Sequence, residues 1–381
     1  MAEKRDADSE SGVSRAHGSR FRSLGRRRFL AAAGATATAG LAGCTGGSAG
    51  SSGQEYAGEQ LRVTGFAGTY ADTLESVIGP MFTEETGAEL VVSRVNATHI
   101  PKIKAAPEDN PPFDAAAVTG LTYKQGRGSD FWLELREENI PNRDQIYDYL
   151  LDYRPTDDAL PVDGGLWTIV YREEMDWTPS AWVDFTDDRA EQVSLRSDYW
   201  NFPVHVAAIA DQEAPLADEL YDESLHDSVF ETIRSMNIPA WTSTPSNMWQ
   251  LFENGVVDMA MSSSEQSLQD ERVTDGELAV TVPAENSGYL DMFVVVRGTE
   301  KRELAEKYID FMLSTEVQER WAEETPNFYA NENIEYPGDL GERVPTSSSE
   351  FEQIAFPDWN TPLFEYRNEL STRFKEALSQ S

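Results

Sequence analysis

Short apolar runs alternate with amphipathic stretches along the chain, and this alternation predicts strands and helices in turn. Residues 61–64, 89–95 and 113–118 form apolar runs of strand length, each bounded by turn residues. Between the first two runs, apolar residues at helical spacing predict a helix that ends at Gly87. Because strands and helices alternate here, we expect a parallel α/β sheet.

The same patterns continue to the end of the chain. Gly164 and Gly165 precede an apolar run in residues 160–171, which is typical of a crossover strand with a close backbone approach. Further strands are expected at 192–196, 256–261, 279–282 and 290–296, and further helices at 214–236, 244–254 and 363–378. The chain therefore predicts an α/β protein with several strands in both halves.

Residues 284–324 combine a polar turn, a short buried strand and a helix. Thr299 is expected to cap this helix. Tyr289 and Asp291 flank Leu290, so both side chains point to the same side of the strand. An aromatic ring beside a carboxylate suggests a binding site, and the alternative is a half-buried strand with solvated residues.

The charge balance is strongly acidic, with 67 Asp and Glu against 31 Lys and Arg and a formal net charge of −36. Such a surface repels nucleic acid and anionic membranes, so we expect no nucleic-acid partner. We interpret it as halophilic adaptation, because salt screens the self-repulsion. Cys44 is the single cysteine of the chain, which excludes internal disulfides.

The residues before Cys44 resemble an export signal. Arg26 and Arg27 form a twin-arginine pair, a weakly apolar Ala/Gly/Thr run follows, and Leu41-Ala42-Gly43-Cys44 resembles a lipoprotein signal-peptidase box. We expect residues 1–43 to be a signal peptide and Cys44 to carry a lipid that anchors the protein to the outer face of the cell membrane. Residues 44–58 form a flexible Gly/Ser linker. The alternative is a disordered Ala-rich leader with a chance cysteine.

Motifs for catalysis and metal binding are absent from the sequence. The four histidines (17, 99, 205 and 226) are scattered, and none has a carboxylate at metal-ligand spacing. No nucleophile elbow, zinc-protease motif, phosphate-binding loop or dinucleotide-binding loop occurs. We therefore expect no catalytic residues, no metal and no cofactor, although catalytic groups far apart in sequence leave an enzyme open.

Several segments in order resemble the spermidine/putrescine-binding protein family of ABC importers. They are Ala67-Gly68-Thr69-Tyr70, PMFTEETG (80–87), LPVDGGLWTIVYRE (160–173), PSAWVDF (179–185), LFENGVVDMAMSSSE (251–265) and the stretch 284–324. With its leader and acidic composition, the chain is similar to lipoproteins of haloarchaeal type. The resemblance implies an α/β, two-lobe periplasmic-binding-protein type II fold with a hinge and an interlobe cleft. It implies one lobe from 59–163 and 289–335 and a second from 164–288 and 336–381.

The resemblance also implies where a ligand binds. Tyr289 stands at the family's stacking Trp, and Asp291 at the Asp that pairs with a ligand amine. Asp198 matches an acidic contact in the second lobe, and Tyr70 lies in a loop that carries cleft aromatics. Asn201 stands where the family often has a Glu.

Cation chemistry gives each of these residues a role. Carboxylates hold a primary ammonium by charge-assisted hydrogen bonds, and aromatic faces cover its methylene stem. Asp291 and Asp198 are expected to hold the two ends of a diamine, with Tyr70, Tyr289 and Trp167 as walls. Asp198 is equally well explained as a helix N-cap, and Tyr70 and Trp167 as core aromatics.

Four further ligand-binding candidates complete the prediction. Thr119, Ser264 and Glu265 follow strand ends, where open α/β sheets place their ligands, and Thr69 precedes Tyr70 in its loop. As at the other positions, ordinary turn and capping roles are the alternative for these residues.

The sequence thus predicts a monomeric, lipid-anchored solute-binding protein. It would capture a small molecule, a polyamine or another organic cation, and deliver it to an ABC permease whose ATPase is another polypeptide. A ferric-iron protein of the same fold is an alternative, although no adjacent Tyr pair occurs. A surface-anchored enzyme or adhesion module is the alternative from a different class.

Overall fold

The computed structural model describes residues 55–153, 156–212 and 222–380. The predicted signal peptide, Cys44 and most of the predicted linker lie outside these ranges. Among the helices within them, none is both long enough and apolar enough to cross a membrane.

A mixed β-sheet forms the centre of the described chain. Its main path is β2 (Glu89–Arg94), β1 (Gln60–Gly65), β3 (Ala115–Thr119), β9 (Asn286–Val296), β5 (Leu160–Arg172), β7 (Met259–Ser263) and β6 (Val193–Ser194). Short strands pair beside it: β4 (Trp132–Leu133), β8 (Leu278–Thr281), β10 (Phe328–Tyr329) and β11 (Ile354–Ala355). The expected parallel pairing is confirmed for β1 with β2 and β3, whereas β9 is antiparallel to both β3 and β5.

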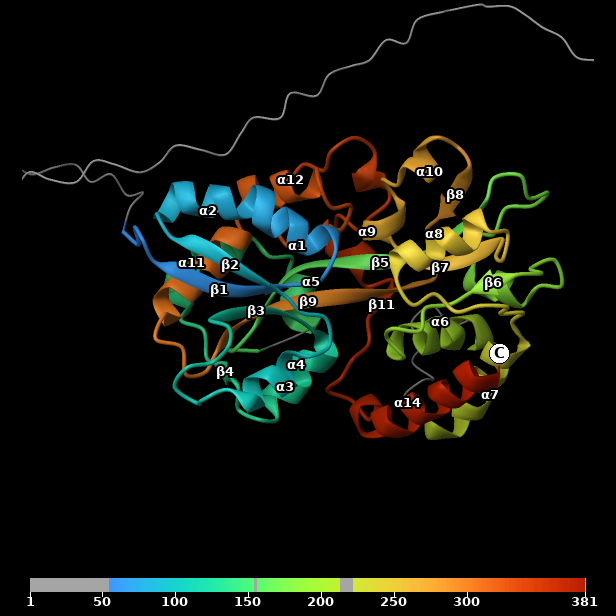
Figure 1. Cartoon of the computed structure of the whole chain (residues 1–381), viewed down its shortest axis with the longest axis horizontal. Coiled ribbons are helices and arrows are strands. Elements are labelled where there is room, and N and C mark those ends of the chain that lie inside the picture. The colour runs from blue at the N-terminus through green and yellow to red at the C-terminus, as the bar shows by residue number, and fades with distance from the viewer. Residues whose placement is uncertain (1–54, 154–155, 213–221, 381) are drawn as a thin grey trace, which may run out of the picture. The chain divides into compact units, whose positions relative to one another are not determined.

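The long strands β5 and β9 cross the middle of the described fold side by side (Figure 1). The first half of β5 pairs with β9, and its second half, from Trp167 onward, pairs with β7 and β8. One strand is therefore shared by two groups of elements, as the crossover prediction for residues 160–171 requires.

Helices lie on both sides of the sheet (Figure 1). They are α1 (Thr69–Thr73), α2 (Gly79–Thr86), α3 (His99–Ala105), α4 (Gly120–Arg127), α5 (Asp148–Tyr153), α6 (Asn201–Gln212), α7 (His226–Ser235), α8 (Pro245–Glu253), α9 (Ser264–Ser267), α10 (Glu271–Thr274), α11 (Arg302–Met312), α12 (Thr315–Ala322), α13 (Ser348–Phe351) and α14 (Leu363–Gln380). Single helical turns add η1 (Leu74–Ile78), η2 (Glu137–Asn139), η3 (Pro141–Gln145), η4 (Trp182–Thr186), η6 (Glu223–Leu225) and η7 (Leu340–Glu342). The predicted end of the first helix is confirmed, since Gly87 follows α2 with a left-handed φ of 83°.

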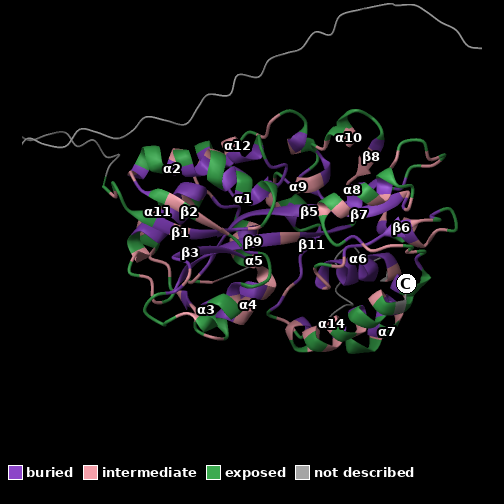
Figure 2. Ribbon diagram, in the orientation of Figure 1, coloured by how far each residue is buried: buried purple, intermediate pink, exposed green. Residues whose placement is uncertain are grey.

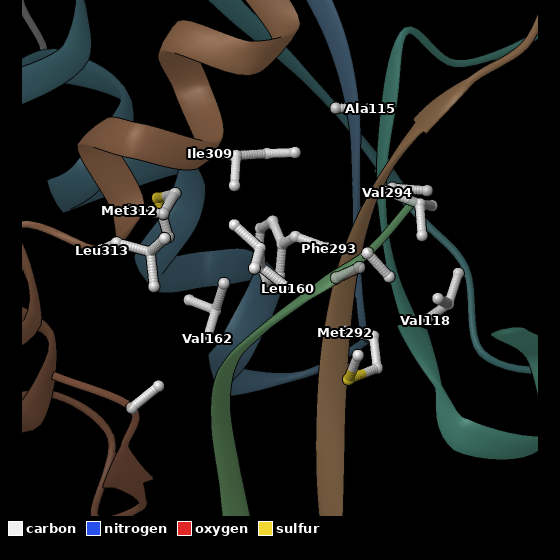
Figure 3. Close-up of a cluster of buried hydrophobic side chains, with 14 of the residues drawn as sticks. Ala115, Val118, Leu160, Val162, Met292, Phe293, Val294, Ile309, Met312 and Leu313 are labelled. Atoms are coloured by element: carbon white, nitrogen blue, oxygen red, sulfur yellow. The ribbon is translucent and has the colours of Figure 1, made fainter. Parts of the chain in front are cut away.

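Two large hydrophobic clusters occupy different parts of the fold. The first packs α1, α2, α11 and α12 against β1, β3 and β9, and the second packs α6, α7 and α14 against β7 and the far half of β5. Buried residues follow the strands, and exposed residues follow the outer helix faces (Figure 2). Figure 3 shows part of the first cluster, where Leu160, Val162 and Phe293 gather beside Ile309 and Met312 of α11 and Leu313, which follows this helix. Each such buried side chain contributes about 1.5–3 kcal/mol to stability.

Two predicted helix caps are wrong. Helix α11 begins at Arg302 and not after Thr299, because the Thr299 hydroxyl donates to Asp114 (2.7 Å). Helix α6 begins at Asn201, and the Asp198 carboxylate is held by Arg196 instead of capping the helix. Thr299 also accepts a hydrogen bond from the backbone N–H of Lys301 (3.0 Å), the residue that precedes α11.

Candidate functional site

A β-bulge in β5 sets the position of the first site residue. Pro161 lies opposite Met292, but the next opposed pair is Asp163 and Asp291, so Val162 is an extra residue on β5. The Val162 carbonyl oxygen is satisfied elsewhere, by the backbone N–H of Ala330 (3.0 Å). The bulge therefore brings Asp163, in place of Val162, to the same face as Asp291.

Asp291 also lies directly opposite Thr119 of β3. Directly opposed residues of antiparallel strands hold their Cβ atoms about 4.5–5.5 Å apart. Thr119, Asp291 and Asp163 therefore form a polar row across three neighbouring strands. Asp163 is 0% exposed and Asp291 is 2% exposed, so water does not solvate either carboxyl group freely.

The two carboxyl groups have different hydrogen-bond partners. The Tyr70 hydroxyl donates to Oδ1 of Asp163 (3.2 Å), and the Asn327 amide donates to Oδ2 (3.4 Å). Oδ1 of Asp291 is buried and has no hydrogen-bond partner among the described residues. Of the two carboxyl groups, Asp291 is therefore the one with an open hydrogen-bonding position.

Glu265, in the first turn of α9, adds a third carboxyl group. Burial raises its pKa, while the Arg196 guanidinium and a backbone hydrogen bond from Tyr70 lower it, with a raised net result. Burial also raises the pKa of Asp163 to about 8, with hydrogen bonds from Tyr70 and Asn327 opposing and the charge of Glu265 adding to the increase. For Asp291, burial and then the charges of Asp163 and Glu265 raise the pKa well above its usual range.

An aromatic cluster adjoins these carboxyl groups. The ring centroid of Tyr289 lies 5.4 Å from that of Trp167 and 6.1 Å from that of Phe202. The Tyr289 hydroxyl donates to Oδ1 of Asn327 (3.3 Å). Gly165 lies opposite Tyr289, and a Cβ at this position would be 2.3 Å from the Tyr289 hydroxyl oxygen. Gly165 thus makes room for the Tyr289 ring.

A partly buried ion pair lies beside the aromatic cluster. Arg196 donates from Nε (3.0 Å) and Nη2 (2.6 Å) to the two carboxylate oxygens of Asp198. Its guanidinium carbon lies 5.4 Å from the ring centroid of Trp167. Both oxygens of Asp198 are therefore already occupied by a cation of the protein itself.

A cavity of about 180 Å³ lies between the two hydrophobic clusters. Thr119, Leu121 and Gln125 line it from the first cluster's elements, and Asp198, Tyr199, Phe202 and Trp359 from the second, with Tyr289 of β9 between them. It is smaller than the roughly 300–1,000 Å³ of typical sites for drug-sized ligands, which suits a small solute.

The structure brings most of the predicted site residues together. Thr119, Asp198 and Tyr289 line the cavity, and Asp291 is the register neighbour of Thr119. Ser264 donates to Asn327 (3.3 Å), and Glu265 contacts Tyr70, although neither Ser264 nor Glu265 lines the cavity. Trp167 and Tyr70 are buried, and Thr69 is exposed at the start of α1.

Two side-chain hydrogen bonds join distant segments near this region. Ser264 of α9 donates to Asn327 (3.3 Å), and Lys124 of α4 donates to Asn360 before α14 (3.0 Å).

Three site residues were missed by the sequence analysis. Arg196 and Asp198 are two residues apart in an extended segment, which places them on one side and was a usable signal. Pro161 inside a predicted strand indicated the bulge that positions Asp163. Asn327 carries no signal, because a single asparagine before a two-residue strand has no recognisable pattern.

Within the described ranges, no group of three or more His, Cys, Asp or Glu side chains is arranged to hold a metal ion. Asp163, Asp291 and Glu265 thus approach one another without forming a metal-binding cluster. The arrangement instead offers carboxyl groups, one ion pair and aromatic faces, which together suit an organic solute.

Comparisons with known proteins show the family and the fold of the chain. The family model "Bacterial extracellular solute-binding protein" matches residues 79–340. No curated protein matches the chain.

Solved structures of binding proteins match most of the chain. An ABC transporter substrate-binding protein from Bradyrhizobium japonicum has a TM-score of 0.69 at 18% identity, covering 84% of this chain and 99% of that one. A protein described as a putative spermidine/putrescine ABC transporter from Listeria monocytogenes has a TM-score of 0.65 at 17% identity, with coverage of 83% and 99%. A protein described as a GABA receptor has a TM-score of 0.70 at 19% identity, with coverage of 84% and 98%.

These likenesses confirm the predicted type II periplasmic-binding fold. The match to the family model, which spans more than half of the sequence, decides between the classes of function left open above. Proteins of this family bind a solute outside the cytoplasm and catalyse no reaction. The chain belongs to the bacterial extracellular solute-binding protein family.

Proposed function

We propose that this protein captures a small organic cation, with a polyamine such as putrescine or spermidine as the leading candidate. The observation that carries this proposal is the group of three carboxyl groups, Asp163, Asp291 and Glu265. In the part of the chain that the structure describes, none of the three forms a salt bridge with a basic side chain of the protein. A ligand ammonium would supply the missing positive charge.

The chemistry of the proposed site follows from its donors and faces. A primary ammonium has three N–H donors, and Oδ1 of Asp291 is a buried acceptor without a partner. Charge-assisted hydrogen bonds of this type are about twice as strong as neutral ones. Tyr289 and Trp167 offer aromatic faces beside it, which attract cations through their quadrupoles.

Asp198 has a smaller part in this proposal than Asp291. Because Arg196 occupies both of its oxygens, a second ligand ammonium must displace the guanidinium or lie near a like charge. The resemblance to a protein described as a spermidine/putrescine transporter supports a diamine. We therefore expect the first ammonium, at Asp291, to provide most of the affinity.

Isothermal titration calorimetry with putrescine and spermidine in high-salt buffer tests the proposal. We expect binding by the native protein and at least tenfold weaker binding by Asp291→Asn, since a hydrogen bond to a charged group contributes about 1.5–3 kcal/mol. Asp198→Asn should weaken binding less than Asp291→Asn. The matched control is Glu84→Gln, which also removes one negative charge, but at an exposed position of α2. This variant should bind the polyamines like the native protein.

Two results would contradict the proposal. One is the absence of heat and of any thermal stabilisation with polyamines and monoamines alike. The other is tight binding of an anionic solute that Asp291→Asn leaves unchanged or strengthens, because an anion would be repelled by the carboxyl groups.

We also propose that Cys44 anchors the exported protein to the outer face of the membrane. The support is the twin-arginine leader and the cysteine box in the sequence, which lie outside the described residues. Expression of Cys44→Ser in a host with the corresponding export pathway should release the protein into the medium, whereas the native protein stays with the membrane fraction. Equal release of both proteins would argue against the anchor.

A further inference from the structure

We propose that Asp163 and Asp291 share one proton in the ligand-free protein and that an ammonium group expels this proton when it binds. The inference rests on the proposed function for its ligand, but the shared proton is a property of the protein alone. It also adds Asp163, which the sequence analysis did not single out, to the ligand-binding residues.

The geometry of the sheet is the first argument. The bulge at Val162 places Asp163 directly opposite Asp291 on the same face, with Cβ atoms at the short cross-strand spacing. Like charges directly opposite each other destabilise a sheet, and both carboxyl groups are almost completely buried. Two ionised carboxylates in this arrangement would repel each other without water to screen them.

The neighbours of the pair supply no compensating cation. Asp163 accepts hydrogen bonds from Tyr70 on α1 and from Asn327 before β10, and both donors are neutral. Around the pair lie the tyrosines 289, 308 and 329 from β9, α11 and β10, and Glu265 from α9 adds a further acidic group. Arg196 acts on Glu265 and Tyr289, but it is ion-paired with Asp198.

The hydrogen bonds around the pair also favour a state in which one of the two carboxyl groups is protonated. Oδ1 of Asp291 is buried without a partner, which costs free energy for a charged oxygen and less for a neutral carboxyl group. The pKa directions agree with this argument, since burial and then the charge of Glu265 raise the pKa of both carboxyl groups. Because loss of both protons would leave two facing carboxylates without water to screen them, we place one proton and one negative charge on the pair at neutral pH.

When an ammonium group binds, it replaces the shared proton between the two carboxyl groups, so that one positive charge takes the place of another. The carboxyl O–H bond breaks, its proton passes to the buffer, and N–H donors of the ammonium take its place between the two carboxylates. The buried charge is unchanged, so the exchange avoids placing a net positive or a double negative charge in the site. Capture is therefore linked to pH.

The shared proton makes ligand binding weaker at lower pH. Below the pKa of the ligand-free pair, the proton competes with the ammonium, so affinity falls about tenfold for each unit of decreasing pH. Above this pKa the pair is already deprotonated, and affinity levels off. A protein without the shared proton would show nearly constant affinity between pH 6 and the pKa of the ligand amine.

Calorimetry with putrescine at pH 7 in buffers of different ionisation enthalpy measures the protons released. We expect about one proton per ligand for the native protein, and a value near zero for Asp163→Asn. Asp114→Asn is the matched control, since Asp114 is a buried carboxylate at the other end of β3 that is ion-paired with Arg62 (2.8 Å). It should release the same number of protons as the native protein.

A second measurement separates this inference from the proposed function. Infrared difference spectra of the ligand-free protein should contain the C=O stretch of a protonated carboxyl group at pH 6 that disappears at pH 9 and is absent from Asp163→Asn. If no polyamine binds but this band is present, the proposed ligand is wrong and the shared proton stands. If polyamine binds without proton release, or if the band is missing or survives in Asp163→Asn, the shared proton is overturned.

Discussion

Gly165 shows how a single missing side chain shapes the site. It faces Tyr289 across the β5–β9 pair, and a Cβ here would lie 2.3 Å from the tyrosine oxygen and 2.5 Å from the ring carbon that carries it. Real Cβ atoms do not come this close, so the ring would have to move. Its hydrogen bond to Asn327, which also contacts Asp163 and Ser264, would then be lost.

We expect Gly165→Ala to lower the free energy of unfolding by about 1–3 kcal/mol, the usual cost of overpacking. Polyamine binding should also weaken, because the displaced ring is a wall of the proposed site. Thermal unfolding and calorimetry measure the two effects separately.

Gly128→Ala is the control for this prediction. Gly128 has a φ of −64°, and the nearest atom to a Cβ there is 3.4 Å away, an ordinary contact. Its unfolding free energy should stay within about 0.5 kcal/mol of the native value. Equal effects of the two substitutions would show that the close approach at Gly165 is unimportant.

At the scale of elements, long strands and amphipathic helices were predictable from the sequence. Apolar runs marked β1, β2, β3, β5 and β9, and helical spacing marked α2, α8, α11 and α14. Two-residue strands such as β4 and β10 were not predictable, because two residues have no periodicity. Their pairing is decided by the strands beside them.

Only part of the candidate site was predictable, because the alternation of side chains is regular on β9 but interrupted on β5. A period of two places Tyr289 and Asp291 on one face of β9, and the observed register confirms this prediction. The same rule fails on β5, because one extra residue moves every later side chain to the other face. Asp163 therefore depends on a bulge that the alternating pattern does not contain.

At the scale of the whole molecule, the net charge of −36 opposes compaction. Figure 2 shows exposed positions along the outer helix faces, where charged side chains interact mainly through solvent. The Debye length falls from about 10 Å at 0.1 M salt to about 3 Å at 1 M. Salt therefore removes most of this repulsion while leaving the buried clusters unaffected.

We expect the melting temperature to rise steadily as potassium chloride increases from 0.1 M to 2 M. Circular dichroism during heating measures this change. Glycerol or sucrose at equal osmolality is the control, since neither screens charge. A melting temperature that is high and constant from dilute buffer upward would refute the halophilic interpretation.

The contacts of Ser264 with Asn327 and of Lys124 with Asn360 also bear on the speed of capture. They join distant segments near the candidate site, in which Asp291 is 2% exposed. Because Asp291 is almost completely buried, we expect a solute to reach its carboxyl group only after the surrounding elements separate. The association rate would then depend on how often the protein opens, and the same opening would limit escape. We therefore expect differences in affinity to appear mainly in the dissociation rate.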